Sequence, residues 1–158
     1  VIRRKTAELF AACGRLGAVT QGAPAEAVEA AADFGMQVGM CFQIRDDIFD
    51  YFPASHIGKP TGNDMAEGKL TLPALHALAV NDDAHQHDVA RRIQQGEATS
   101  EEIAAFVEWV KAQGGIDYAR QVMENFRTKA LRSLDAFTND DIRRALTLYM
   151  DYVIGRDM

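Results

Sequence analysis

The sequence contains little cysteine and no long apolar run. Only Cys13 and Cys41 occur among the 158 residues, and because neither stands in a metal-ligand spacing, we expect two small core residues rather than a disulfide. No stretch approaches the roughly 18 to 20 apolar residues of a membrane span. The beginning of the sequence, Val1 to Thr6, also lacks the apolar segment of a signal peptide. We therefore expect a cytoplasmic protein without a membrane span.

Basic residues are outnumbered by acidic ones. The sequence has 17 Lys and Arg against 23 Asp and Glu, which gives a formal net charge of −6. Because the phosphate backbones of nucleic acids are bound by an excess of Lys and Arg, this balance argues against nucleic acid as a partner. An anionic ligand would need a local cationic pocket or bound metal ions.

The apolar residues follow the period of helices. They make up 47% of the chain, enough to bury a substantial core in one domain over residues 1–158. Almost every segment has the 3.6-residue helical period, and no segment alternates as a strand does, so we predict an all-α fold. Helices are predicted at about Ile2–Val19, Pro24–Phe52, Leu72–Leu78, Asp82–Gln95, Ser100–Gln113, Gly115–Ala136 and Asp140–Arg156.

The second predicted helix, Pro24–Phe52, combines a core face with three acids. On a helical wheel its core stripe contains Phe34, Val38, Cys41, Phe42, Phe49 and Phe52. A second line on the wheel contains Gly39, Gln43, Asp46 and Asp50. Asp47 lies further round the helix.

The acids of this helix indicate a bound cation. Asp46 and Asp50 lie one helical turn apart, about 6 Å, and point the same way. Two ionised carboxylates side by side repel each other, so the arrangement is unfavourable without a cation between or above them. Mg²⁺ suits this role because it binds few carboxylates and commonly bridges to phosphate oxygens. A solvated acidic face is the alternative.

The first predicted helix, Ile2–Val19, brings a lysine and a threonine close to its apolar side. We assign its core stripe to Ile2, Leu9, Cys13 and Leu16. Lys5 and Thr6 project within or beside this stripe, and a lysine directed at a core must pair with an anion or reach out to water. If this helix packs beside the second one, Lys5 can face an anion held by metal at Asp46 and Asp50. A lysine that simply reaches solvent is the equal alternative.

The segment Pro53–Leu70 is rich in Gly, Pro, Asn and Asp, and it is too long for a tight connection. Such loops are more often functional than idle. Lys59 and Lys69 each follow a glycine, which allows the backbone to approach a phosphate closely beside a mobile cation. The spacing is not that of a P-loop, so a nucleotide triphosphatase is not expected. A flexible surface loop would have a similar composition.

Several motifs occur together in a fixed order. They are Lys5-Thr6-Ala7, Phe42-Gln43-Ile44 continuing through Asp46-Asp47-Ile48-Phe49-Asp50-Tyr51, Ile57-Gly58-Lys59-Pro60, Glu67-Gly68-Lys69-Leu70-Thr71-Leu72-Pro73, and the ending Ala145 to Arg156. In this order and spacing the chain resembles the C-terminal half of the trans-isoprenyl (polyprenyl) diphosphate synthases. The resemblance implies the C-terminal portion of an isoprenoid-synthase-type helical bundle.

The resemblance also implies a reaction and a set of site residues. The reaction is the Mg²⁺-dependent head-to-tail condensation of an allylic diphosphate with isopentenyl diphosphate to make a polyprenyl diphosphate, carried out by a homodimer. The implied residues are Asp46, Asp47 and Asp50 for Mg²⁺, Lys5, Lys59 and Lys69 for the diphosphate, and Lys5, Thr6 and Gln43 as catalytic residues lining the site. The run Asp46 to Asp50 corresponds to the second aspartate-rich motif of the family.

One part of the family pattern has no counterpart in this sequence. The first aspartate-rich motif and the upstream basic residues for isopentenyl diphosphate are absent, and no other DDxxD run occurs. We therefore expect a fragment that does not catalyse the full reaction alone. Three alternatives stay open: a non-catalytic helical subunit of a heteromeric synthase, a class I terpene cyclase, or a plain helical interaction bundle. The Lys5-Thr6 and Gly68-Lys69 pairs resemble the synthases better than the cyclases.

Overall fold

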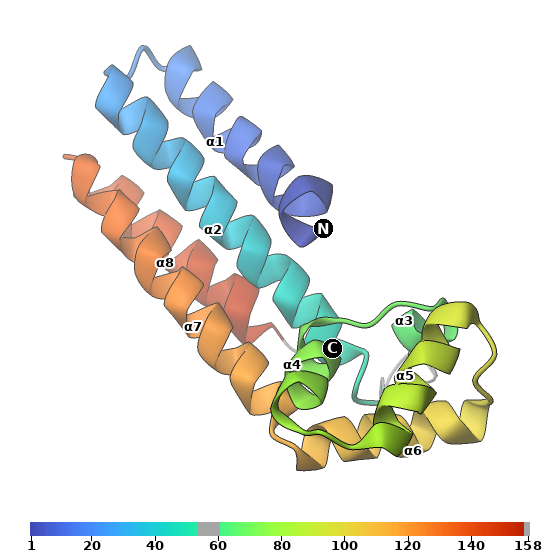
Figure 1. The fold of residues 1–158 in the computed structure, drawn as a ribbon. Helices are drawn as coiled ribbons and strands as arrows, with labels where there is room; N and C mark the ends of the chain where they lie inside the picture. Colours follow the sequence, from blue (N-terminus) through green and yellow to red (C-terminus); the bar gives the residue numbers. More distant parts are fainter. Residues whose placement is uncertain (54–60, 157–158) are drawn as a thin grey trace. The chain divides into compact units, whose positions relative to one another are not determined.

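The computed structural model describes residues 1–53 and 61–156, and their regular structure is helical (Figure 1). In chain order the elements are η1 (Arg3–Ala7), α1 (Glu8–Thr20), α2 (Ala25–Phe49), α3 (Asn63–Ala66), α4 (Leu72–Val80), α5 (Ala84–Gln95), α6 (Ser100–Ala112), α7 (Gly115–Ser133), η2 (Leu134–Ala136) and α8 (Asp140–Gly155). Those two ranges contain no strand, so the all-α prediction is confirmed. No helix in the same ranges is long and apolar enough to span a bilayer.

Every predicted helix is present, with its ends shifted by a few residues. The predicted second helix ends at Phe49 rather than Phe52, because Asp50 and Tyr51 form a turn. The short helix α3 lies in the segment Pro53–Leu70, which was predicted as a loop. Local periodicity therefore located the long helices and missed one helix that is a single turn long.

The described residues form two compact units. Unit 1 contains residues 1–45 and 122–156, and unit 2 contains residues 46–121. Unit 1 therefore holds η1, α1, most of α2, the larger part of α7, η2 and α8. Unit 2 holds the end of α2, the helices α3 to α6 and the start of α7. The expectation of a single domain stays a prediction.

Helix α2 contacts each of the other long helices of unit 1. The thiol of Cys41 donates to the carbonyl oxygen of Met123 on α7 at 3.4 Å, and burial raises the pKa of this thiol to about 12. The ring of Phe42 packs against Phe10 of α1, with 5.6 Å between ring centroids. Arg156, the residue after α8, lies over the same ring. These contacts confirm that the first predicted helix packs beside the second.

Helices α1 and α2 approach each other through small residues. A Cβ atom added to Gly14 would lie 2.2 Å from the carbonyl oxygen of Ala31, and one added to Gly35 would lie 2.3 Å from that of Phe10. Both distances are far below van der Waals contact, so only glycine allows the two backbones to come this close. The backbones themselves form much of the interface in place of large side chains.

The apolar stripe predicted for the first helix is therefore wrong as a core face. Leu9 is 66% exposed and Leu16 62% exposed, and α1 contains no buried residue. Cys13 is exposed as well, contrary to the expectation of a core position, whereas Cys41 is buried as expected. The physical reason is that the small residues of the helix face α2. A core face predicted from large apolar side chains therefore lies on the side of the helix that does not face α2.

Unit 2 is organised around α6, which neighbours α3, α4 and α5. Its buried side chains are Ile103, Phe106, Val107 and Val110. Helix α5 contributes a second apolar row made of Val89, Ala90 and Ile93. Both rows follow the i, i+3, i+4 spacing of amphipathic helices, and their burial holds the unit together.

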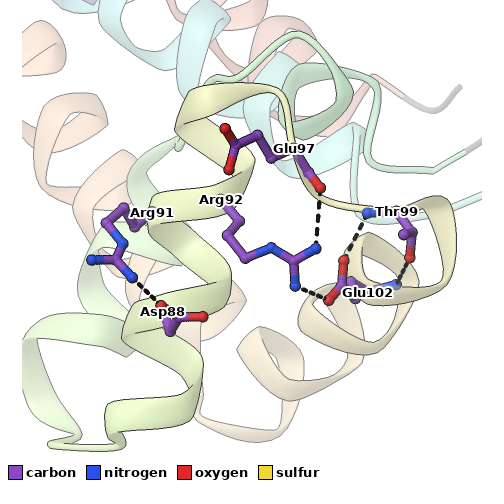
Figure 2. Close-up of polar contacts among 6 residues, drawn as sticks. All are labelled: Asp88, Arg91, Arg92, Glu97, Thr99 and Glu102. Atoms are coloured by element: carbon purple, nitrogen blue, oxygen red, sulfur yellow. Dashed lines mark hydrogen bonds and ion pairs between the residues drawn. The ribbon is translucent and has the colours of Figure 1, made fainter.

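A capping box fixes the start of α6 (Figure 2). The hydroxyl oxygen of Thr99 accepts from the Glu102 N–H at 3.3 Å, and the Glu102 carboxylate accepts from the Thr99 N–H at 2.8 Å. Arg92 of α5 donates to the same carboxylate and to the carbonyl oxygen of Glu97. The capping residue is thus Thr99, one residue before the helix start predicted at Ser100. The backbone hydrogen bond from Thr99, assisted by Arg92, lowers the pKa of Glu102.

Replacing Thr99 with Ala should lower the free energy of unfolding by about 1 kcal/mol at pH 7, since the first turn of α6 loses its cap. The Glu102→Gln variant should also be less stable than the native chain at pH 7. Because the pKa of Glu102 is lower in the folded chain, this difference is present above its ordinary value of 4.5 and shrinks as the pH falls below it. Urea unfolding across pH 3 to 7 measures both effects. A Glu101→Gln control removes a charge outside the capping box. If Glu101→Gln and Glu102→Gln lowered the free energy of unfolding equally, the capping box would not be the cause.

The two glycines of α1 provide a matched pair for testing the close helix packing. Gly14→Ala should lower the free energy of unfolding by about 1–3 kcal/mol, because the added methyl group meets the α2 backbone. A Cβ at Gly17 meets nothing within 4 Å, so Gly17→Ala should raise the free energy of unfolding by about 0.5–1 kcal/mol through helix propensity. Urea unfolding of both variants checks the signs. Destabilisation of similar size in both would contradict the proposed packing.

Candidate functional site

The three predicted acids lie at the end of α2, in unit 2. Asp46 and Asp47 belong to the last turns of the helix, and Asp50 is the first residue after it. The N–H of Asp50 still donates to the carbonyl oxygen of Asp46 at 3.3 Å, so the predicted one-turn spacing is kept. Asp47, which the helical wheel placed away from the other two, is only 5% exposed, whereas Asp46 and Asp50 are half-buried. A carboxylate at this depth stays ionised only with nearby compensation.

The acids do not form a closed metal cage. Within residues 1–53 and 61–156, no three histidine, cysteine or acidic side chains are grouped so as to hold a metal ion. Mg²⁺ does not require such a cage, because it usually binds one or two carboxylates and takes its other ligands from water and substrate phosphates. The donor set of Asp46 and Asp47 fits that mode of binding.

Asp50 accepts three hydrogen bonds from successive backbone amides. The N–H of Gly62 donates to its main-chain carbonyl oxygen at 2.8 Å. The N–H groups of Asn63 and Asp64 donate to Oδ1 and Oδ2 of its side chain, each at 3.0 Å. Asp50 therefore caps the start of α3, which no side chain of its own segment caps.

Sequence analysis missed α3 and its cap. Gly62 has a φ of 79°, and a Cβ there would lie 2.7 Å from a methyl carbon of Ile103, so the position requires glycine. The run Gly62-Asn63-Asp64 is typical of a helix start and could have predicted the helix. Nothing local indicates that the capping carboxylate comes from Asp50, because the partners are 13 and 14 residues apart.

Lys69 follows α3 and lies among acids of unit 2. Its ammonium group bonds to the carboxylate of Glu67 and is 3.9 Å from that of Asp64. The hydrogen bond and charge of Glu67, with smaller contributions from Asp64 and Asp50, raise the pKa of Lys69. The side chain is largely exposed, so the Glu67 pair is weak and a stronger anion can replace it. Lys59, also predicted to contact the diphosphate, lies outside the described residues.

Thr6 and Gln43 meet in unit 1. The hydroxyl group of Thr6 donates to the side-chain oxygen of Gln43 at 3.0 Å, and Gln43 is almost fully buried. The structure thus brings together two predicted site residues that stand 37 positions apart. Lys5 was expected within or beside the core stripe, but its side chain is exposed. Lys5 lies in η1, and its exposure agrees with the alternative of a lysine that reaches solvent.

Arg156 contacts both the ring and the backbone of Phe42, the residue before Gln43. The guanidinium carbon of Arg156 lies 3.9 Å from the centroid of the Phe42 ring, and its NH2 group donates to the Phe42 carbonyl oxygen at 3.2 Å. Arg45 donates in turn to the carbonyl oxygen of Arg156 at 2.9 Å. A guanidinium group over an aromatic face is a favourable contact. The structure therefore adds Arg45 and Arg156 to the residues that support this motif, and sequence analysis had assigned neither of them a role there.

An apolar groove of about 450 Å³ lies beside these residues in unit 1. It is lined by side chains of α1, α2 and α8, among them Leu9, Phe10, Phe34, Val38 and Leu146. The exposure of Leu9 is explained in part by this groove, since the side chain forms one of its walls. A groove of this composition can accommodate a hydrocarbon chain or a further apolar helix.

Comparisons with known proteins agree with the motifs. The polyprenyl synthetase family matches residues 1–110. The heptaprenyl diphosphate synthase component 2 of Geobacillus stearothermophilus is 38% identical over 157 residues, which is 99% of this chain and 48% of that protein. The chain therefore spans about half the length of the curated relatives it matches.

Solved structures give the same result. The geranylgeranyl pyrophosphate synthase of Bacteroides thetaiotaomicron is 48% identical, with a TM-score of 0.92 over 98% of this chain and 51% of that one. The polyprenyl synthase of Caulobacter crescentus, complexed with calcium and isoprenyl diphosphate, is 34% identical, with a TM-score of 0.89 over 99% and 48% of the two chains. The fold of this chain is thus similar to half of each synthase.

The bond between Thr6 and Gln43 can be tested by isosteric substitution. Thr6→Val removes the donor hydroxyl group and should lower the free energy of unfolding by about 1 kcal/mol. Thr6→Ser keeps the hydroxyl group and should lower the free energy of unfolding by less. Urea unfolding of the two variants measures the difference, and a Val variant as stable as the Ser variant would show that the bond contributes nothing.

Proposed function

Because this chain belongs to the polyprenyl synthetase family, we propose that it is the C-terminal part of a prenyltransferase that condenses an allylic diphosphate with isopentenyl diphosphate. The observation that supports this most strongly is the arrangement at the end of α2. Asp46 and Asp47 lie there on one helix end, and Asp50 joins that end to the segment that contains Lys69. Acids for a metal and a cation for a phosphate are thus combined within unit 2.

We propose Asp46 and Asp47 as the residues that hold Mg²⁺. Both are carboxylates, the ligands that Mg²⁺ prefers. When bound, the ion would supply positive charge to the departing pyrophosphate. A Mg²⁺ ion bound by one or two carboxylates keeps coordination positions for phosphate oxygens, which suits a substrate with a diphosphate group.

The lysines would act on the same leaving group. Ionisation of the allylic substrate leaves a carbocation and a pyrophosphate with increasing negative charge, and positively charged donors held ready for that charge lower the barrier. Lys69 would exchange its exposed bond with Glu67 for the diphosphate. Lys5 and Lys59 are proposed for the same ligand, as the resemblance implies.

In unit 1, considered by itself, the part-buried Thr6–Gln43 pair and the apolar groove would contact an apolar ligand group. The Thr6 hydroxyl group would help to fix the position of the Gln43 side chain. The groove lined by Phe10, Phe34 and Val38 has the apolar walls that an isoprenoid chain would need. Apolar walls also keep water from the allylic cation, which would otherwise be hydrolysed.

Full catalysis is proposed to need residues that this sequence does not contain. The first aspartate-rich motif of the family has no counterpart here, so we expect no condensation product from this chain alone. A second candidate function is a non-catalytic helical subunit that works with a separate polypeptide, and two relatives are named component 2 of a heptaprenyl diphosphate synthase. A non-catalytic subunit of that kind would not need to bind Mg²⁺ or pyrophosphate. The homodimer and the cytoplasmic location stay predictions.

The decisive test of the proposed site is the binding of pyrophosphate with Mg²⁺. The chain should bind pyrophosphate more tightly when Mg²⁺ is present, and Asp46→Asn should remove most of that increase, at least tenfold in Kd, because a metal ligand is lost. Isothermal titration calorimetry with and without Mg²⁺ measures the effect.

Asp82→Asn is the matched control, because it removes the same charge from an exposed position of unit 2. It should bind as the native chain does. No heat and no thermal shift with the native chain would instead favour the non-catalytic subunit or a plain helical bundle. If both variants lost the Mg²⁺-dependent tightening of pyrophosphate binding equally, only the overall charge of the chain would matter.

A further inference from the structure

The side chain of Asp50 accepts hydrogen bonds from the backbone amides of one segment. Oδ1 accepts from the N–H of Asn63 and Oδ2 from the N–H of Asp64, each at 3.0 Å. The main-chain carbonyl oxygen of Asp50 accepts from the N–H of Gly62 at 2.8 Å. Three consecutive amides of the chain are thus bound by a single residue.

The segment Gly62–Lys69, which starts with these amides, is held together by backbone hydrogen bonds. The N–H of Ala66 donates to the carbonyl oxygen of Gly62 at 2.9 Å, and the N–H of Lys69 donates to that of Asp64 at 2.7 Å. The side chain of Met65 is buried and anchors the middle of the segment. Because the N–H groups of residues 66–69 each donate to an earlier residue of the segment, a displacement of Gly62 to Asp64 would displace Lys69 as well.

We propose that Asp50 is a positioning residue for the diphosphate site and not a metal ligand. Its carboxylate ties the segment Gly62–Lys69 to the end of α2, and this tie sets where the ammonium group of Lys69 lies relative to the metal-binding acids Asp46 and Asp47. The inference deepens the proposed function and rests on it for the identity of the ligand. The capping of α3 by Asp50 does not rest on the proposed function, because it follows from the hydrogen bonds alone.

The geometry favours this role over metal binding. A carboxylate bound to Mg²⁺ directs an oxygen at the ion, whereas both oxygens of Asp50 are directed at amides of the same short helix. Turning one oxygen to a metal would leave a helix-start amide without its acceptor. Each oxygen keeps a second lone pair, so the test must separate the two roles directly.

Amide hydrogen exchange without metal tests the capping. In Asp50→Ala, the amides of Asn63 and Asp64 should exchange roughly tenfold faster than in the native chain, because both lose a charged acceptor. Asp50→Asn keeps one acceptor oxygen and should accelerate only one of the two amides. Asp82→Asn should change neither amide. Acceleration of less than threefold in Asp50→Ala would overturn the proposal.

The dependence of pyrophosphate binding on Mg²⁺ separates positioning from metal binding. Asp50→Asn should weaken binding several-fold both with and without Mg²⁺, because Lys69 is displaced in both cases, and the tightening produced by Mg²⁺ should be unchanged. Asp46→Asn should instead reduce that tightening. If Asp50→Asn reduces the tightening as much as Asp46→Asn does, Asp50 is a metal ligand and the proposal is wrong.

A failure of the proposed function gives a different result from a failure of the positioning role of Asp50. A native chain that binds no pyrophosphate at any Mg²⁺ concentration would contradict the synthase site and, with it, the positioning of Lys69 for a diphosphate. The exchange measurement would still decide whether Asp50 holds the segment Gly62–Lys69.

Discussion

Carboxylates at a partly buried helix end must be compensated, and this constraint governs the organisation of unit 2. Asp47 is nearly inaccessible to solvent and Asp50 is half-buried, so both need hydrogen-bond donors or positive charge nearby. For Asp50 the donors are the backbone amides that begin α3. The carboxylate of Asp50 needs hydrogen-bond donors, and the first amides of α3 need an acceptor. The same hydrogen bonds therefore satisfy both groups. That contact also determines where the segment with Lys69 lies.

A second constraint acts in unit 1, where the backbones of α1 and α2 are in direct contact. The approach is possible because Gly14 and Gly35 have no side chain at the contact. It brings Thr6 within hydrogen-bond distance of Gln43, and Leu9 and Phe10 of α1 line a groove. Two motifs that are far apart in the sequence thus become one polar pair beside an apolar surface.

The long helices could be predicted from the sequence because their signals are local. Apolar spacing, Pro24 and the glycines around residues 114 and 115 located the ends of these helices within a few residues. The approximate position of the acids followed from the same periodicity. What could not be predicted depends on contacts between distant residues: the burial of Asp47, the exposure of Leu9 and Leu16, and the capping of α3 by Asp50. A helical wheel describes one helix and does not contain the partner that buries or binds its side chains.

In the proposed site, Asp46 and Asp47 would share a divalent ion with a pyrophosphate that Lys69 also contacts. The most direct measurement is a crystal structure of the chain with Mn²⁺ and pyrophosphate, in which anomalous scattering locates the metal. We expect Mn²⁺ bonded to the carboxylate of Asp46 and to pyrophosphate oxygens, with Asp50 still bonded to the amides of Asn63 and Asp64. Mn²⁺ bonded to Asp50 with those amides released, or no Mn²⁺ at the end of α2, would contradict the account.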